Sequence, residues 1–131
     1  MSEWRREASK QLPELQPIVA SSWVDNPMML WIELNMEFGR LCLQDEPPVD
    51  LLSRMWKYGL WCLAARSDQV SNAAAVAFIE HILDWEEKVS ILPQITSALE
   101  LNGLRPILEI HRTADEVDVF LDALWRKDRR R

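Results

Sequence analysis

Apolar residues recur every three to four positions in four segments of the chain, and no segment alternates convincingly between apolar and polar residues. This spacing predicts amphipathic α-helices rather than strands. We therefore expect an all-α protein, a compact bundle of about six helices, folded as a single domain over residues 1–131. The helices at 27–44 and 69–88 are expected among its core members.

Capping residues mark where several of these helices begin. Polar side chains that accept a hydrogen bond from the first turn precede three of the predicted helices, and a proline in the first turn supports two starts. The starts are Asn26 before Pro27, "DEPPVD" at 45–50, Ser67 or Asp68, and Thr113 with Glu116 three residues later as a capping box.

Other boundaries follow from proline and glycine. A short helix over residues 3–12 is expected to end before Pro13. Pro93 is expected to open a further helix that "NG" at 102–103 closes. Residues 104–112 fit either an extended edge segment or a helical turn, and the pattern does not choose between them.

The polar positions also predict which residues are buried. The helix at 27–44 carries one narrow polar stripe, and "YGLWCLAA" at 58–65 has no polar side, which places Trp61 in the core. Trp4 and Trp23 lie outside the strongest periodic segments and become interface candidates if they are exposed. The remaining tryptophans occupy apolar helical positions and are expected in the core with Trp61: Trp31, Trp56, Trp85 and Trp125.

Charge and composition narrow the class of function. The net charge of −6 argues against nucleic-acid binding, which needs a basic face, and favours another protein, of basic character, as partner. No apolar run is long enough to span a bilayer, so we expect no membrane partner. Cys42 and Cys62 lack metal-ligand spacing and resemble small buried apolar residues of a reducing cytoplasm, which is the expected location.

Acidic residues form two stripes on the predicted helices. Glu80, Asp84 and Glu87 share the outer face of the helix at 69–88, with His81 at its border, and a second stripe lies on the last helix. Most such stripes are simply solvated. If they have a function, we expect electrostatic recognition of a basic partner. The candidate partner-binding residues are Glu80, His81, Asp84, Glu87, Asp115, Asp118 and Asp122.

The same residues do not predict a metal or catalytic site. Glu80 directly precedes His81, so on a helix their side chains diverge by about 100°. His111 lies outside any predicted helix, and the Glu-x-x-His pattern of helical di-metal sites is missing. With two histidines, three glycines and no nucleophile motif, the chain is expected to need no metal or cofactor and to be no enzyme.

One segment resembles a known repeat. "ARSDQVSNAAAVAFIEHI" resembles the turn and second helix of a HEAT-type repeat, because Asp68, Val70 and Ala73 or Ala74 match its D-x-V-x-x-A pattern. Ser71 stands where the repeat usually has a basic residue. The resemblance covers one repeat at most, so it implies packing of helices in pairs rather than a long solenoid.

Residues 28–87 more broadly resemble small all-helical bacterial proteins that are predicted to be immunity factors for polymorphic toxins. The matching pieces are Ser67-Asp68, Val70, Asn72-Ala73 and Phe78-Ile79-Glu80. The resemblance implies a cytoplasmic binding protein without catalysis that occludes a toxin, and it assigns no site residue. The alternative is a small helical enzyme or ligand-binding domain with a Trp-lined pocket.

Overall fold

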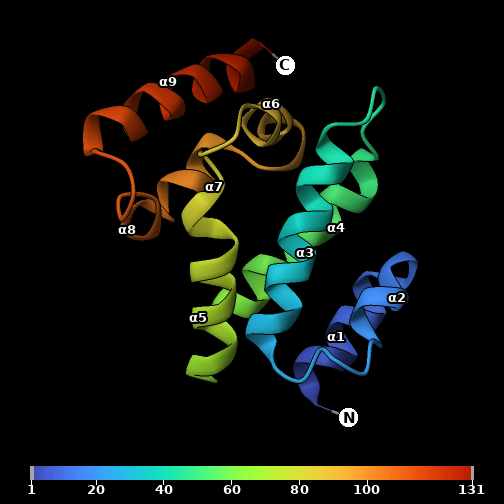
Figure 1. The fold of residues 1–131 in the computed structure, drawn as a ribbon. Coiled ribbons are helices and arrows are strands. Elements are labelled where there is room, and N and C mark those ends of the chain that lie inside the picture. Colours follow the sequence, from blue (N-terminus) through green and yellow to red (C-terminus); the bar gives the residue numbers. More distant parts are fainter. Residues whose placement is uncertain (1, 131) are drawn as a thin grey trace.

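The protein is all-helical in its computed structural model, which describes the backbone of residues 2–130 and the side chains of residues 2–126. Nine α-helices follow one another in this part of the chain, and two 3₁₀ turns, η1 (Pro13–Leu15) and η2 (Ile79–His81), join them (Figure 1). The α-helices are α1 (Glu3–Gln11), α2 (Gln16–Val19), α3 (Pro27–Cys42), α4 (Val49–Leu63), α5 (Asp68–Ala77), α6 (Glu86–Ile95), α7 (Ala98–Asn102), α8 (Arg105–Leu108) and α9 (Ala114–Arg130). None of them is long and apolar enough to cross a membrane.

The helix starts that depend on local capping match the sequence analysis. Asn26 Oδ1 accepts a hydrogen bond from the Met29 N–H at 2.9 Å, and Ser67 Oγ accepts one from Val70 at 3.4 Å. The capping box before α9 is formed in both directions between Thr113 and Glu116, at 3.1 and 3.2 Å. These three predictions are confirmed because each depends on side chains within one helical turn.

The core lies where α3, α4 and α5 meet. Phe78 stacks on Trp31 with ring centroids 4.8 Å apart and meets the edge of Phe38 at 5.1 Å. Gly59 of α4 lets this ring approach, because a Cβ there would lie 3.1 Å from two Phe78 ring atoms. Trp31 also donates its indole N–H to Cys62 Sγ at 3.4 Å, so its one polar atom is paired within the core.

The predicted helix over residues 69–88 is wrong. α5 ends at Ala77, and the chain continues through η2 and a turn before α6 begins at Glu86. In a straight helix Leu83 would lie about 140° around the axis from Phe78. The break instead buries both residues together with Ile79 and Ile82. The free energy gained by burying these side chains exceeds what a longer helix would gain. The periodicity of the sequence does not show this, because it does not include tertiary contacts.

The C-terminal half also differs from the prediction. Pro93 lies inside α6 rather than at a helix start, and Ser97 caps α7 by accepting from the Glu100 N–H at 3.1 Å. Residues 104–112 form the helical turn α8 and a bend, which settles the open choice against an extended segment. The number of helices in the described part of the chain exceeds about six because α2, α7 and α8 are single turns of four or five residues.

The tryptophans divide differently from the prediction. Trp31 and Trp56 are buried as expected, whereas Trp61 is only partly buried and stacks on Tyr58. Trp85 and Trp125, which were expected in the core, are 57% and 53% exposed. Trp23 is 52% exposed, whereas Trp4 is partly buried. Because exposure was the condition for an interface candidate, Trp23 remains one.

Candidate functional site

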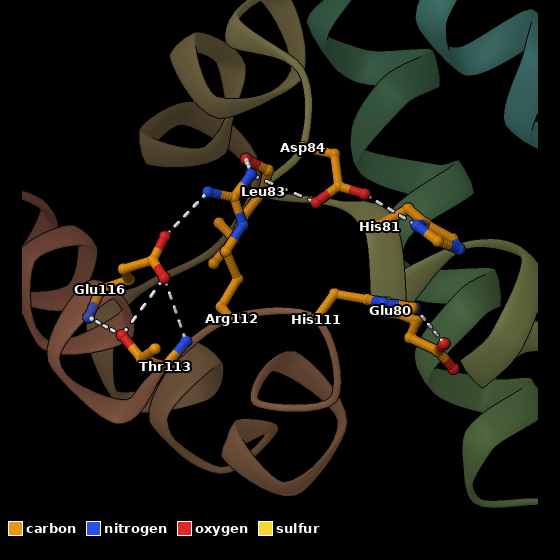
Figure 2. Close-up of polar contacts among 8 residues, drawn as sticks. All are labelled: Glu80, His81, Leu83, Asp84, His111, Arg112, Thr113 and Glu116. Atoms are coloured by element: carbon orange, nitrogen blue, oxygen red, sulfur yellow. Dashed lines mark hydrogen bonds and ion pairs between the residues drawn. The ribbon is translucent and has the colours of Figure 1, made fainter.

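Two histidines from distant parts of the chain stack on each other. His81 ends η2, and His111 lies in the bend between α8 and α9. Their ring centroids are 4.6 Å apart, and the angle between the ring planes is 22°. Figure 2 shows the two rings lying close together with carboxylates beside them. We call the residues Glu80, His81, Asp84, His111 and Arg112 the histidine cluster.

Buried neighbours hold the two segments of the cluster in place. On the first segment Ile79 and Ile82 point into the core, so Glu80 and His81 lie on the outer side of the turn. On the second, Leu108 is buried and anchors α8 before the chain reaches His111. Hydrophobic contacts far from either histidine therefore bring together rings that are 30 residues apart in the chain.

Each ring is paired with a carboxylate. His111 Nε2 lies 2.5 Å from Glu80 Oε1, and His81 Nδ1 lies 2.8 Å from Asp84 Oδ2. The Glu80 side chain is only 11% exposed, whereas the two imidazoles are about 40% exposed. Solvent and small solutes therefore reach the rings, while Glu80 lies behind them.

Arg112 connects the cluster to α9. Its guanidinium donates to the Leu83 carbonyl at 2.9 Å, to Asp84 Oδ1 at 3.2 Å and to Glu116 Oε2 at 3.3 Å (Figure 2). Partial burial raises the pKa of the Asp84 carboxyl, but the hydrogen bonds from His81 and Arg112 outweigh it, so the net pKa lies below its ordinary value. Asp84 is thus held ionised between two donors.

The ligand atoms of three cluster residues lie close enough together to be considered for metal binding. One nitrogen from each histidine and one Glu80 oxygen all lie within 4.8 Å of one another. The sequence analysis found no such site, because it placed Glu80 and His81 on a straight helix and could not locate His111.

The thiols offer no nucleophile to this cluster. Burial raises the pKa of Cys42 to about 11, and burial also raises that of Cys62. Both therefore stay protonated at neutral pH inside the core. The nearest hydroxyl along the chain, Thr113, is engaged in the capping box.

The first acidic stripe is not a shared helix face. Glu80 and Asp84 belong to the histidine cluster, whereas Glu87 lies in the first turn of α6 beside Trp85 and Met36. The three residues do not share one helix face because α5 ends at Ala77, before all of them. That these residues bind a partner remains a prediction.

The second acidic stripe does lie on one helix, and it borders a groove. Asp115, Asp118 and Asp122 are exposed on α9. A groove of about 520 Å³ lies between α7 and α9, and Asp118 and Asp122 are among its lining residues. Its other lining residues are Ala98, Leu99, Asn102, Arg105, Leu121 and Trp125. We call it the α7–α9 groove. The sequence analysis identified its carboxylates but not its apolar lining.

Two large apolar side chains of this groove are exposed to solvent. Leu99 is 79% exposed and Trp125 53% exposed, although both are large apolar side chains. Asp118 forms an ion pair with Arg105, which also donates to Glu109 at 2.8 Å, so part of the charge is balanced within the protein. His81 does not line this groove, the groove beside Trp4 and Trp61, or the groove beside Trp85.

Comparisons of the chain with models of protein families, with curated proteins and with solved structures returned no match. The proposals that follow rest on the geometry of the groove and of the histidine cluster, and on the sequence resemblance of residues 28–87.

Proposed function

We propose that the protein is a non-catalytic binding protein that accepts a basic, partly apolar segment of another protein in the α7–α9 groove. The observation that carries the proposal is that Leu99 and Trp125 are exposed in a groove bordered by carboxylates. Exposed aromatic side chains next to a concave apolar surface are typical anchors of protein interfaces.

The chemistry of the groove favours a cationic partner. Trp125 offers an aromatic face and Asp122 a carboxylate beside it, a combination that suits an Arg or Lys side chain. The net charge of −6 supplies a field that attracts such a segment over several ångströms and accelerates its association.

An immunity factor that occludes a basic toxin is the specific form of this proposal. It is supported by the resemblance of residues 28–87 to such factors. Occlusion needs a recognition surface and no catalytic group.

Affinity capture from the organism that encodes the protein tests the proposal. Immobilised wild type is expected to retain a basic protein, and Leu99→Lys is expected to lose it, because the substitution puts a cation into the groove. Val76→Lys is the matched control, since Val76 is also an exposed apolar residue, on α5. Retention by Leu99→Lys, or loss by both variants, would contradict the assignment of the groove.

Co-expression tests the immunity form separately. If the captured protein is toxic when it is expressed alone, wild type should restore growth and Leu99→Lys should not. A captured protein that is harmless on its own would overturn the immunity form but leave the binding function standing. Retention of a small molecule instead of a protein would favour the alternative of a ligand-binding domain.

A further inference from the structure

We propose that Glu80, His81 and His111 form a binding site for a divalent transition-metal ion, independent of the α7–α9 groove. Two imidazoles and a carboxylate from segments 30 residues apart bring their ligand atoms within 4.8 Å of one another. The two imidazoles also lie face to face, with ring centroids 4.6 Å apart. The ligand set is therefore assembled by the fold and not by a local sequence motif.

The spacing is close to what a metal ion requires. Zinc bonds to histidine nitrogens and carboxylate oxygens are about 2.0–2.2 Å long, which puts the ligand atoms of a tetrahedral site roughly 3.4 Å apart. Atoms 4.8 Å apart would have to approach each other by about 1.4 Å, and the His111–Glu80 pair at 2.5 Å would have to open by about 0.9 Å. The half-exposed side chains of His81 and His111 have the freedom to make these shifts.

The contact between His111 and Glu80 already has the form of a shared ligand pair. His111 Nε2 and Glu80 Oε1 lie 2.5 Å apart and point at each other. A divalent cation between them replaces the proton that they share, and it satisfies both the ring nitrogen and the nearly buried carboxylate. The exchange releases the proton, so metal binding is expected to depend on pH.

Asp84 and Arg112 supply an outer shell around the site. Asp84 binds His81 at Nδ1, which orients the ring and leaves Nε2 as the nitrogen for the metal. Arg112 in turn holds Asp84 from the other side at 3.2 Å. A carboxylate on the second nitrogen of a histidine is the usual support of a metal-bound imidazole. Asp84 is thus a positioning residue rather than a ligand.

The donor set selects the class of ion and its effect. Imidazole ligands favour zinc and its neighbours among the first-row transition metals over magnesium or calcium, which prefer oxygen. A bound ion connects the turn at 79–84 to the bend at 109–113, so it stabilises the contact between these segments. Three protein ligands leave one position for water.

Zinc titration of the metal-free, untagged protein tests the proposal. We expect about one Zn²⁺ per chain, measured by competition with a chromophoric chelator, and a melting temperature that rises with free zinc. Affinity should fall in acid, because protons compete with the metal ion for the ligand atoms. Wild type that binds no zinc under these conditions would overturn the site.

Four variants distinguish the roles. His81→Ala and His111→Ala are each expected to lose binding by more than about 100-fold, and Asp84→Asn to weaken it by about 10–100-fold while one zinc per chain is kept. Asp25→Asn, which changes an exposed carboxylate in the segment before α3, outside both the cluster and the α7–α9 groove, is the matched control and should bind as wild type does. Circular dichroism checks that each variant is folded. Equal affinity in wild type and both histidine variants would contradict the proposal.

Discussion

Phe78 shows how a single side chain determines the course of the chain. It is fully buried at the point where α5 ends, and its ring contacts Trp31, Phe38 and Trp56, which come from α3 and α4. Three aromatic contacts and the open space above Gly59 stabilise this position. The end of α5 at Ala77 is therefore part of how the core is filled.

Trp31 is expected to be among the most sensitive positions. Its side chain is fully buried and stacks on both Phe78 and Tyr58, so Trp31→Ala should lower the free energy of unfolding by about 3–5 kcal/mol. Trp23→Ala is the control, because Trp23 is half-exposed and should change stability by less than about 0.5 kcal/mol. Chemical denaturation measures both, and equal losses would contradict the packing described for Trp31.

Regular helices made burial easier to predict but did not ensure it, because Trp61 of the unbroken α4 is only partly buried. Trp31 and Trp56 lie in unbroken helices, and periodicity placed them correctly. Trp85 lies after the break at Phe78, which changes the face on which it falls. Trp125 follows the buried Leu124 by one residue on α9, a helix that packs on one side only, and it lies at the edge of the buried face.

At the scale of elements, the N-terminal helices are attached to α4 by polar contacts. Arg54 forms an ion pair with Glu14 of η1 and donates to the Gln11 carbonyl at 2.9 Å. The Tyr58 hydroxyl donates to the Trp4 carbonyl at 2.7 Å. These contacts add to the burial of Ala8, Leu12 and Leu15 in holding the segment against the core, and they make its attachment sensitive to pH.

Acid should weaken this attachment in a specific range. The hydrogen bond from Arg54 lowers the pKa of Glu14 from 4.5 to about 2. Because the folded pKa is the lower one, the contribution to stability is present above about 4.5 and is lost as the pH falls towards 2. Glu14→Gln should therefore lose less stability than wild type between pH 5 and 2 in thermal unfolding. Asp45→Asn, at an exposed carboxylate, is the control and should follow the wild-type pH profile. Identical pH profiles for Glu14→Gln and wild type would contradict the ion pair between Arg54 and Glu14.

The elements also show where sequence patterns stop being informative. Caps at Asn26, Ser67 and Thr113 were predictable because the partners lie within one turn. The break after Ala77 and the passage of α6 through Pro93 were not, because both depend on contacts with residues distant in the sequence. Local patterns also predicted the helix ends at Gln11 and Asn102, but they gave a wrong helix start at Pro93.

Across the whole molecule, α1 and α2 lie on one side of the α3–α5 core, and α6–α9 lie on the other (Figure 1). Several side-chain contacts fasten the C-terminal half, among them the hydrogen bond from Lys88 of α6 to Asn35 of α3 at 2.8 Å. The Trp56 indole N–H donates to Glu100 of α7 at 2.7 Å, and Arg112 donates to the Leu83 carbonyl at 2.9 Å. The histidine cluster therefore lies at the junction between the core and α8–α9.

Loss of Arg112 should loosen this junction more than the core. In Arg112→Ala, amides of α8 and α9 should exchange with solvent faster than in wild type, while α3 and α4 change little, because the lost contacts belong to the junction. Arg66→Ala, in the exposed turn before α5, is the matched control. Hydrogen exchange followed by mass spectrometry resolves these segments. Uniform acceleration over all helices would show that Arg112 supports the fold as a whole.

Both candidate sites depend on this overall arrangement. The α7–α9 groove needs Leu99 of α7 beside Trp125 of α9, and the histidine cluster needs residues 30 positions apart. The sequence identified Asp118, Asp122 and His81 as candidates because their types are informative. It could not show which of them meet, since that follows from tertiary packing.

The affinity of the captured protein for wild type, Trp125→Ala and Trp23→Ala tests the proposed function most directly. The two tryptophans are matched in exposure, at 53% and 52%, and only Trp125 lines the α7–α9 groove. We predict that Trp125→Ala raises the dissociation constant by about 30-fold or more, the effect of a 2 kcal/mol anchor, and that Trp23→Ala leaves it unchanged. An unchanged dissociation constant for Trp125→Ala, or an equal loss for Trp23→Ala, would contradict the account.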